Sequence, residues 1–451
     1  MESGRPGDEG LRVGTDDRKG WKAIAVIRAG GMFSAPTLMV GAALGLGCGL
    51  GGAAAATAAG FGFIVLYMSF VSMQASDVGT PTALLAEPAL GRAGARWMVS
   101  LIVGVVTVGW FGVQTAVCGA SLAVMLGTTF GLDVPVEACA LVLGLLMLAT
   151  AVIGFSGLQW LSTAAAPLLL AVCLYGVVAS LVADGGLGGL LGYGPDAADA
   201  LGFLTGVNMA IGLFAFAGFT AGDIARFART RRDAVLSCVV GVLPAALVAL
   251  TCAASLAIVT GEGDVAVLMN SLGLPIVGLV ALVLSAWTVN ASNVYSAGLG
   301  FAVMLGRGGE SGSKLTTLAA GLAGIALALV GILGQFEMFL SFLSATAPAL
   351  AGAVIADYWV VRRGRSENIE VVDGVSGCGA AAVLGGLAAG LVSGGAFDNV
   401  LGLVASEGLL SVGPVNALVV SMAVYVGAYY GTGRTVYRGP VRWRTSRRDD
   451  L

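Results

Sequence analysis

The sequence predicts an all-α polytopic membrane protein. Of its 451 residues, 57% are hydrophobic and 11% are charged, whereas a soluble domain carries about 25% charged residues. The mean hydropathy is +0.93. The chain also contains 71 glycines, and small residues let membrane helices pack closely and break locally. These three observations exclude a soluble protein and place most of the chain in a bilayer.

The composition also argues against an enzyme. No histidine occurs in the chain, which removes histidine metal sites, serine–histidine triads and histidine proton relays. A membrane-embedded enzyme would need acids or nucleophiles within the bilayer, and few acids lie inside the apolar runs. We therefore expect no enzymatic activity, no cofactor and no nucleic-acid partner.

About twelve apolar runs are long enough to cross a bilayer, which takes roughly 17–25 residues. They begin near Trp21, Ala53, Trp97, Pro135, Leu161, Leu201, Ala234, Leu274, Leu315, Phe336, Gly377 and Pro414. We expect residues 1–20 to be a disordered cytoplasmic tail and 431–451 a basic cytoplasmic tail. Residues 21–361 form the predicted core, and residues 377–430 form two additional membrane helices.

Basic residues are concentrated in alternate loops between these runs. With the N-terminus inside, the loops on the inner side contain Arg92, Arg96, Arg226, Arg229, Arg231, Arg232, Arg307, Lys314, Arg362, Arg363 and Arg365. The opposite loops contain acidic residues but no lysine or arginine. This positive-inside pattern predicts an even number of spans. It also predicts a multi-pass protein of the inner (plasma) membrane with both termini in the cytoplasm.

Two of the predicted helices are interrupted. Gly30, Gly31 and Pro36 stand in the middle of the first, and the sixth contains the stretch from Gly212 to Gly222. Unwound backbone is tolerated in a membrane only where it is buried in protein or lines a cavity. Paired breaks in two halves of a chain point to an inverted-repeat secondary transporter. Close packing of glycine-rich helices is the alternative explanation, and a channel would favour repeated filter elements.

Four stretches carry a family resemblance: “VTVGWFGVQTAVCG” from Val106, “FTAGDIARFAR” from Phe219, “AWTVNASNVYSAGLGFA” from Ala286 and “FLSATAPALAGAVIADYWVVRR” from Phe342. Together and in this order they resemble the nucleobase–cation symporter family (purine/cytosine permease family), and within it the cytosine permease branch. The resemblance implies a leucine-transporter-type fold. That fold has two inverted five-helix repeats, at about 21–183 and 201–361, with helices 1 and 6 broken.

Trp110 and Gln114 are four residues apart, so they share one face of a helix. An aromatic ring and an amide on one face can stack a flat ring and bond its polar edge. The resemblance implies that both residues bind substrate. Cytosine-type members carry a base-reading glutamine where this chain has Thr107, and that departure leaves the identity of the ring open.

The resemblance implies a second ring contact on span six. Phe214 stands at the family's spacing from Asp223, with Phe216 and Phe219 as alternatives. Gly212, at the start of this stretch, is a further candidate contact with the substrate.

On span eight, Asn290 matches the family's base-reading asparagine. An amide inside an apolar span must find partners or cost several kcal/mol. The alternative is that Asn290 and Asn293 bond neighbouring helices.

The resemblance also implies a cation site. It consists of the carbonyls of Ala29 and Met32 on span one and of the Ser285 carbonyl and the Thr288 hydroxyl on span eight, and oxygen ligands of this kind suit sodium. Sodium-coupled members carry a second hydroxyl where this chain has Val289. We therefore expect weak sodium dependence, with protons as the alternative coupling ion.

Three charged residues inside or beside the spans need an explanation. Arg28 lies roughly 10 Å from the interface by helical rise and is predicted to snorkel to the cytoplasmic surface. The alternative is a fixed cation that substitutes for sodium or repels it. Asp223 and Arg226 are one turn apart and are predicted to form an ion pair that holds a gate. A proton-carrying carboxylate is the alternative, and both interpretations extend to Asp357.

The sequence therefore predicts a secondary active transporter. It would import a nucleobase, cytosine or a related pyrimidine or purine, by cation symport with alternating access. Its partners would be the ring, a sodium ion or a proton, and the lipid bilayer. Carriers of hydantoin or allantoin, of hydroxymethylpyrimidine, or of another substrate in the same superfamily are the alternatives.

Overall fold

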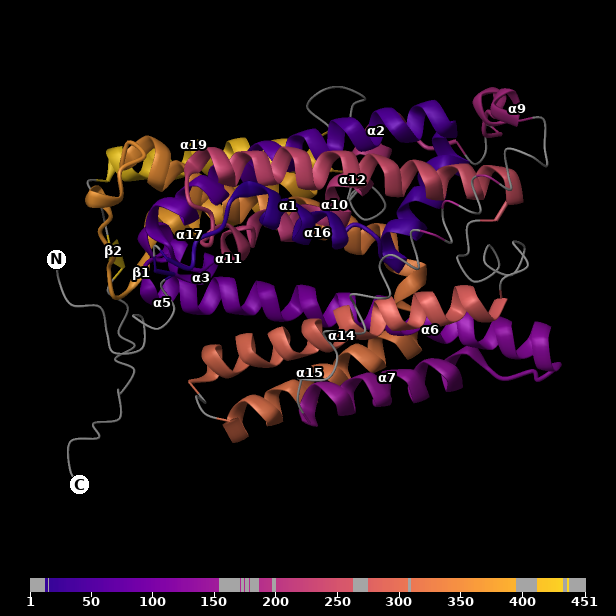
Figure 1. Cartoon of the computed structure of the whole chain (residues 1–451). Helices are drawn as coiled ribbons and strands as arrows, with labels where there is room; N and C mark the ends of the chain where they lie inside the picture. Colours follow the sequence, from indigo (N-terminus) through magenta and orange to yellow (C-terminus); the bar gives the residue numbers. More distant parts are fainter. Residues whose placement is uncertain are drawn as a thin grey trace.

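The computed structural model describes residues 13–14, 16–153, 186–196, 200–262, 275–306, 310–394, 412–432 and 436–437, with isolated positions 171, 174 and 178. These residues are almost entirely helical (Figure 1). Five helical segments of the described chain are long and apolar enough to cross a membrane: Ala35–Val78, Arg92–Phe130, Arg231–Thr260, Gly312–Val330 and Ile332–Val361. The all-α membrane fold is confirmed, and the predicted fifth span, near Leu161, lies outside the described residues.

The first predicted break is present. Helix α1 (Trp21–Gly30) ends at the paired glycines, and α2 (Ala35–Val78) begins after four non-helical residues with Pro36 in its first turn. Proline is tolerated there because the first helical N–H groups have no partner within the helix. Within α2 the backbone turns at Gly49, whose φ is +68°. This bend separates the end of predicted span one from span two.

The second predicted break is also present. Helix α10 (Phe203–Phe219) ends before Thr220, and α11 (Gly222–Ala225) is a single turn. The chain then enters α12 (Arg231–Thr260), where the Thr230 side chain accepts a hydrogen bond from the amide of Asp233. This bond caps the start of α12, because the hydroxyl accepts from a backbone N–H group that has no partner within the helix.

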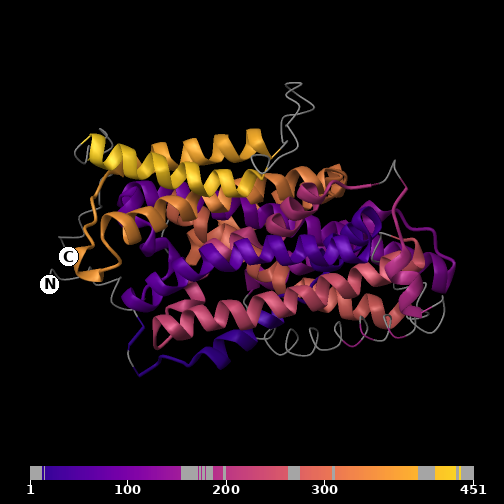
Figure 2. The ribbon, with the colours of Figure 1, turned by 90° about the horizontal axis from the view of Figure 1, so that it is seen from above.

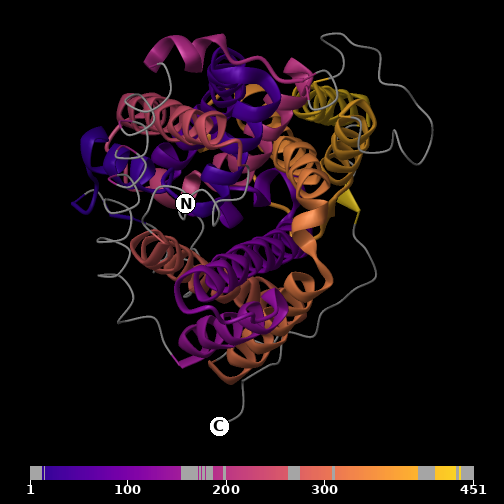
Figure 3. The same ribbon diagram turned by 90° about the vertical axis from the view of Figure 1, so that its right-hand side faces the viewer.

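The helices form two groups that face each other (Figures 1 and 3). In the first, here called the α2 group, α2 packs against α10 and α12, and α1 packs against α12. In the second, the α6 group, α6 (Ser100–Phe130) packs against α7 (Val136–Ile153), α14 (Pro275–Leu305) and α15 (Glu310–Val330).

The remaining long helices lie against the α2 group. Helix α16 (Phe336–Ile355) packs on α10 and continues as the π-helical segment η4 (Ala356–Val361). Helices α17 (Gly377–Ser393) and α19 (Gly413–Gly431) pack on each other and on α16, as Figure 2 shows from above. A short antiparallel pair joins β1 (Val375–Ser376) to β2 (Val436–Tyr437).

Several loops meet at one end of the molecule. This end carries the basic side chains of Arg92, Arg226, Arg229, Arg231 and Arg362 and is called the arginine-rich end. The segment before α1 is bonded there to the loop after α11, because Lys19 donates its amide to the carbonyl of Phe227. The backbone amide of Trp21 also donates to the Asp233 carboxylate at 3.0 Å. These bonds attach the start of α1 to the start of α12.

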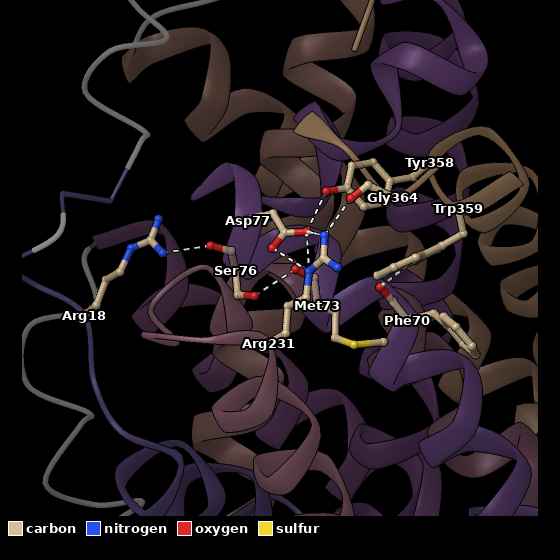
Figure 4. A network of polar contacts seen from close by, with 9 residues as sticks. All are labelled: Arg18, Phe70, Met73, Ser76, Asp77, Arg231, Tyr358, Trp359 and Gly364. Carbon is tan, nitrogen blue, oxygen red and sulfur yellow. Dashed lines mark hydrogen bonds and ion pairs between the residues drawn. The ribbon is translucent and has the colours of Figure 1, made fainter. Parts of the chain in front are cut away.

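Figure 4 shows a polar network at this end that joins α2, α12 and η4. Arg231 holds the carboxylate of Asp77 with both Nε and Nη2, at 2.9 and 2.7 Å. The hydroxyl of Tyr358 donates to the same carboxylate, and Arg231 also donates to the carbonyl of Gly364. Bidentate pairing of this kind fixes orientation as well as charge. The network therefore holds three separate segments in one arrangement.

Candidate substrate site

A cavity of about 550 Å³ lies between the two helix groups. One face of α6 forms much of its wall, with side chains at Ser100, Val103, Thr107, Trp110 and Gln114. These positions recur every three or four residues, as one face of a helix requires. Helix α14, beside α6, adds Val289 and Asn293, and the facing wall comes from the first break, α10 and α11. The sequence-predicted Trp110, Gln114, Thr107 and Phe214 therefore share one cavity.

Aromatic rings define the deep part of this cavity. The ring of Trp110 packs edge-on against Phe339 and Phe336, with ring centroids 5.3 and 6.4 Å away. Phe214 lies across the cavity and contacts Phe61 at 5.8 Å between centroids. Rings supported by other rings lose little rotamer freedom on binding. Trp110 and Phe214 are thus held from behind while their free surfaces line the cavity.

Two polar side chains lie beside Trp110. Gln114 is 2% exposed, and its Oε1 has no hydrogen-bond partner among the described residues. An unsatisfied buried acceptor costs about 1–3 kcal/mol, which a bound N–H group would recover. The hydroxyl of Thr107 donates to the carbonyl of Val103 at 2.7 Å, so toward the cavity it offers an acceptor.

The structure places Asn290 outside the cavity. Its side chain is fully buried, and Nδ2 donates to the carbonyl of Phe111 and to the hydroxyl of Thr115, each at 3.1 Å. These bonds join α14 to α6, as the alternative in which Asn290 bonds a neighbouring helix predicts. The neighbouring Asn293 lies on the cavity wall instead. The two asparagines are three residues apart, and the rotation of α14 about its axis determines which of the two side chains faces the cavity.

Gly212 also lies outside the cavity wall. A methyl group added there would lie 2.9 Å from Cβ of Leu340 and still closer to the carbonyl oxygen of Leu340. Gly212 therefore permits the close approach of α10 to α16. Its relation to the cavity is indirect, because Phe214, two residues further on, lines the cavity.

The predicted cation ligands lie near the junction of α14 with the first break. The hydroxyl of Ser285 donates to the carbonyl of Phe33 at 3.4 Å. The carbonyl of Ala29 accepts the amide of Met32 at 3.1 Å, so in this conformation it caps the end of α1. Val289 lines the cavity and is 41% exposed, whereas the side chain of Thr288 lies outside the described part of the structure.

Asp223 and Thr82 form the end of the cavity nearest the arginine-rich end. One carboxylate oxygen of Asp223 accepts the backbone amide of Thr82 at 2.8 Å. Arg226 contacts the backbone of the same residue, because its Nε donates to the carbonyl oxygen of Asp223 at 3.2 Å. The carboxylate therefore joins α11 to the start of α3 (Thr82–Leu85).

A second carboxylate, at the end of predicted span ten, forms the expected ion pair. Asp357 lies 3.3 Å from Nε of Arg362, and the Tyr425 hydroxyl donates to the same carboxylate oxygen at 2.8 Å. This contact joins η4 to α19. Its buried acid is paired, as a charge inside a protein requires.

The prediction that Arg28 snorkels to the surface is wrong. The side chain does not snorkel; it is 3% exposed and turns into the α2 group. Its Nη2 donates to the hydroxyl of Ser72 at 3.2 Å and to the carbonyl of Ala221 at 3.4 Å. The packing of α1 against α12 covers the route to the surface that snorkelling would need.

Two interrupted helices that meet one aromatic cavity between two helix groups define a secondary transporter of the leucine-transporter type. Comparison with solved structures gives the same fold. The inward-facing structure of Mhp1 matches with a TM-score of 0.79 at 18% identity, over 96% of each chain. Mhp1 in a closed conformation with bromovinylhydantoin bound matches with a TM-score of 0.74. A Na⁺-coupled sialic acid symporter matches with a TM-score of 0.54 over 91% of this chain and 95% of that chain.

Residues 15–408 match the family described as “Permease for cytosine/purines, uracil, thiamine, allantoin”. The cytosine permease of Escherichia coli strain K12 is 32% identical over 346 residues, which are 77% of this chain and 79% of the permease. A second cytosine permease, from Escherichia coli O157:H7, shows the same identity and coverage. The chain belongs to this family of permeases.

Proposed function

We propose that the protein imports a nucleobase, or a closely related planar ring, together with a cation. The observation that carries this proposal is the cavity bounded by Trp110 and Phe214 with the unpartnered Oε1 of Gln114 beside them. Two aromatic surfaces with a hydrogen-bonding group between them complement a flat ring that has a polar edge. The relatives named cytosine permease support this substrate class.

The acceptors on the cavity wall favour particular rings. Gln114 Oε1 and the Thr107 oxygen both accept hydrogen bonds, so a ring with adjacent N–H donors complements them. Cytosine carries an exocyclic amino group, and uracil, hydantoin and allantoin carry N–H groups within or beside the ring. Cytosine is the first candidate because of the relatives, and the other rings remain as alternatives.

The proposed orientation follows from the distribution of charge. Loops that carry lysine and arginine face the cytoplasm in membrane proteins, so the arginine-rich end is the inner end of an inner-membrane protein, with both termini inside. The cavity reaches Asp223 and Thr82 at this end. We therefore infer an inward-facing state, which the higher TM-score with inward-facing Mhp1 supports.

Thermal unfolding of the purified protein against a panel of rings tests the proposal. A ligand that binds only the folded state stabilises it by RT ln(1 + [L]/Kd), about 2.7 kcal/mol at one hundred times Kd. We expect cytosine or a close relative to raise Tm. Amino acids and sugars should leave it unchanged. A panel in which no nucleobase, hydantoin or allantoin raises Tm, with sodium or without, would contradict the proposed substrate class.

A further inference from the structure

Arg28 is a buried cation with incomplete partners. Its side chain is 3% exposed, and one nitrogen, Nη2, contacts both Ser72 and the carbonyl of Ala221. The other two nitrogens, Nε and Nη1, have no hydrogen-bond partner among the described residues. No ion pair joins Arg28 to a carboxylate within those residues. A buried charge without compensation costs several kcal/mol, so its surroundings must supply negative potential in another form.

The C-terminal end of α1 supplies part of it. Helix α1 ends at Gly30, and Arg28 stands in its last turn. A helix C-terminus carries the equivalent of about −0.5 elementary charge on its free carbonyls. The carbonyl of Ala221, in the second break between α10 and α11, is a further acceptor that Arg28 shares with the amide of Ala225.

The end of α1 is a carbonyl end of the kind at which a coupling cation binds in transporters with discontinuous helices. The predicted cation ligand Ala29 is the neighbour of Arg28 and belongs to the same end of α1. In this structure its carbonyl accepts the amides of Gly31 and Met32. Val289, which has no hydroxyl, lines the cavity at the predicted site on α14. Both the charge and the ligand set thus depart from what a sodium ion would meet in sodium-coupled relatives.

We propose that Arg28 is a permanent internal cation that neutralises the carbonyl end of α1 and so weakens the linkage between sodium and substrate. This inference rests on the proposed function. A sodium ion stabilises a conformation to the extent that it gains from binding the carbonyls at that end. Where a guanidinium already occupies the negative potential, a second cation gains less and is repelled.

Two substitutions separate the charge of Arg28 from its hydrogen bonds. Arg28→Gln removes the charge and keeps N–H donors for Ser72 and Ala221, whereas Arg28→Lys keeps the charge. Arg229→Gln is the matched control, because it removes the same charge from an exposed side chain at the arginine-rich end. The full-length protein in liposomes is titrated with radiolabelled cytosine over 0–100 mM sodium, with choline at constant ionic strength. Sodium-dependent shifts of Tm are measured in parallel without cytosine.

Wild type, Arg28→Lys and Arg229→Gln are expected to bind cytosine with a Kd that changes little with sodium. In Arg28→Gln, sodium should tighten cytosine binding by between about 5- and 150-fold, the usual range of coupling between two sites. Sodium should also raise Tm in Arg28→Gln alone. The proposal is wrong if wild type already shows such linkage, or if Arg28→Gln folds and stays insensitive to sodium by both measurements.

The wild-type titration and the Tm series still test the proposal if Arg28→Gln does not fold or if wild type does not bind cytosine. Should Arg28→Gln fail to fold, strong sodium linkage in wild type still overturns the proposal, and its absence together with a wild-type response in Arg28→Lys supports it. Absence of cytosine binding in wild type would contradict the proposed function instead. The Tm response of Arg28→Gln to sodium would then test Arg28 by itself.

Discussion

Replacing Gly212 by alanine tests whether the approach of α10 to α16 positions the substrate site. The added methyl group would lie 2.9 Å from Cβ of Leu340, where ordinary contact begins at 3.4 Å. The Leu340 carbonyl oxygen is closer still and belongs to the backbone, so it cannot turn away as a side chain can. The two helices would therefore have to separate by at least about 0.5 Å.

The expected cost follows from two opposing contributions. Overpacking a well-packed interior costs about 1–3 kcal/mol, and alanine recovers up to about 1 kcal/mol of helix propensity over glycine. We expect a net loss of about 1–2 kcal/mol. Because Phe214 moves with α10, a comparable loss should appear in ligand binding, and 1.4 kcal/mol is a factor of about ten in Kd.

The measurements are the thermal unfolding of the purified variant and its Kd for radiolabelled cytosine. Gly427→Ala in α19 is the control, because an added methyl there meets no described atom within 4 Å. The control should match wild type in cytosine affinity and be no less stable. If Gly212→Ala also bound cytosine as tightly as wild type with an unchanged Tm, the close contact with Leu340 would not position Phe214.

Three further predictions concern the ring edge, the cation site and the topology. Gln114→Ala should weaken the binding of rings that donate N–H groups by about 1–3 kcal/mol and leave the binding of analogues without the donor unchanged. A uniform loss of affinity across a panel of rings would show that Gln114 acts through packing. Val289→Thr should raise the apparent affinity for sodium, measured as the Kd for cytosine across a sodium series at two pH values. Strong linkage between sodium and cytosine in wild type, unchanged by the substitution, would show that the Val289 side chain is irrelevant to coupling. Arg229→Cys should resist an impermeant thiol reagent in intact cells, and labelling there would overturn the proposed orientation.

The helix breaks could be predicted from sequence because they depend on local chemistry. Gly30, Gly31 and Pro36 interrupt an apolar run, and the structure ends α1 and begins α2 at these residues. The spacing of Trp110 and Gln114 predicted a shared helix face, and both residues line the cavity. Each inference uses only the period of a helix or the freedom of a backbone.

The contacts that the sequence could not place depend on distant partners. The rotation of α14 turns Asn293 rather than Asn290 toward the cavity, and that rotation is set by packing against α6. Arg28 turns inward because α1 packs against α12. Arg231 pairs with Asp77 across 154 residues, which no local pattern in either segment reveals. Such contacts follow from which helices are neighbours.

The stacking role of Trp110 is the central claim, and cytosine binding by Trp110→Ala tests it most directly. Loss of ring stacking and of the buried area around it is worth a few kcal/mol, or about a hundredfold in Kd. The full-length protein is titrated with radiolabelled cytosine, and Trp21→Ala serves as a control outside the cavity. We predict that Trp110→Ala loses measurable binding while its Tm without ligand stays close to wild type, and that Trp110→Phe retains part of the affinity. Cytosine binding by Trp110→Ala as tight as that of wild type would contradict the account.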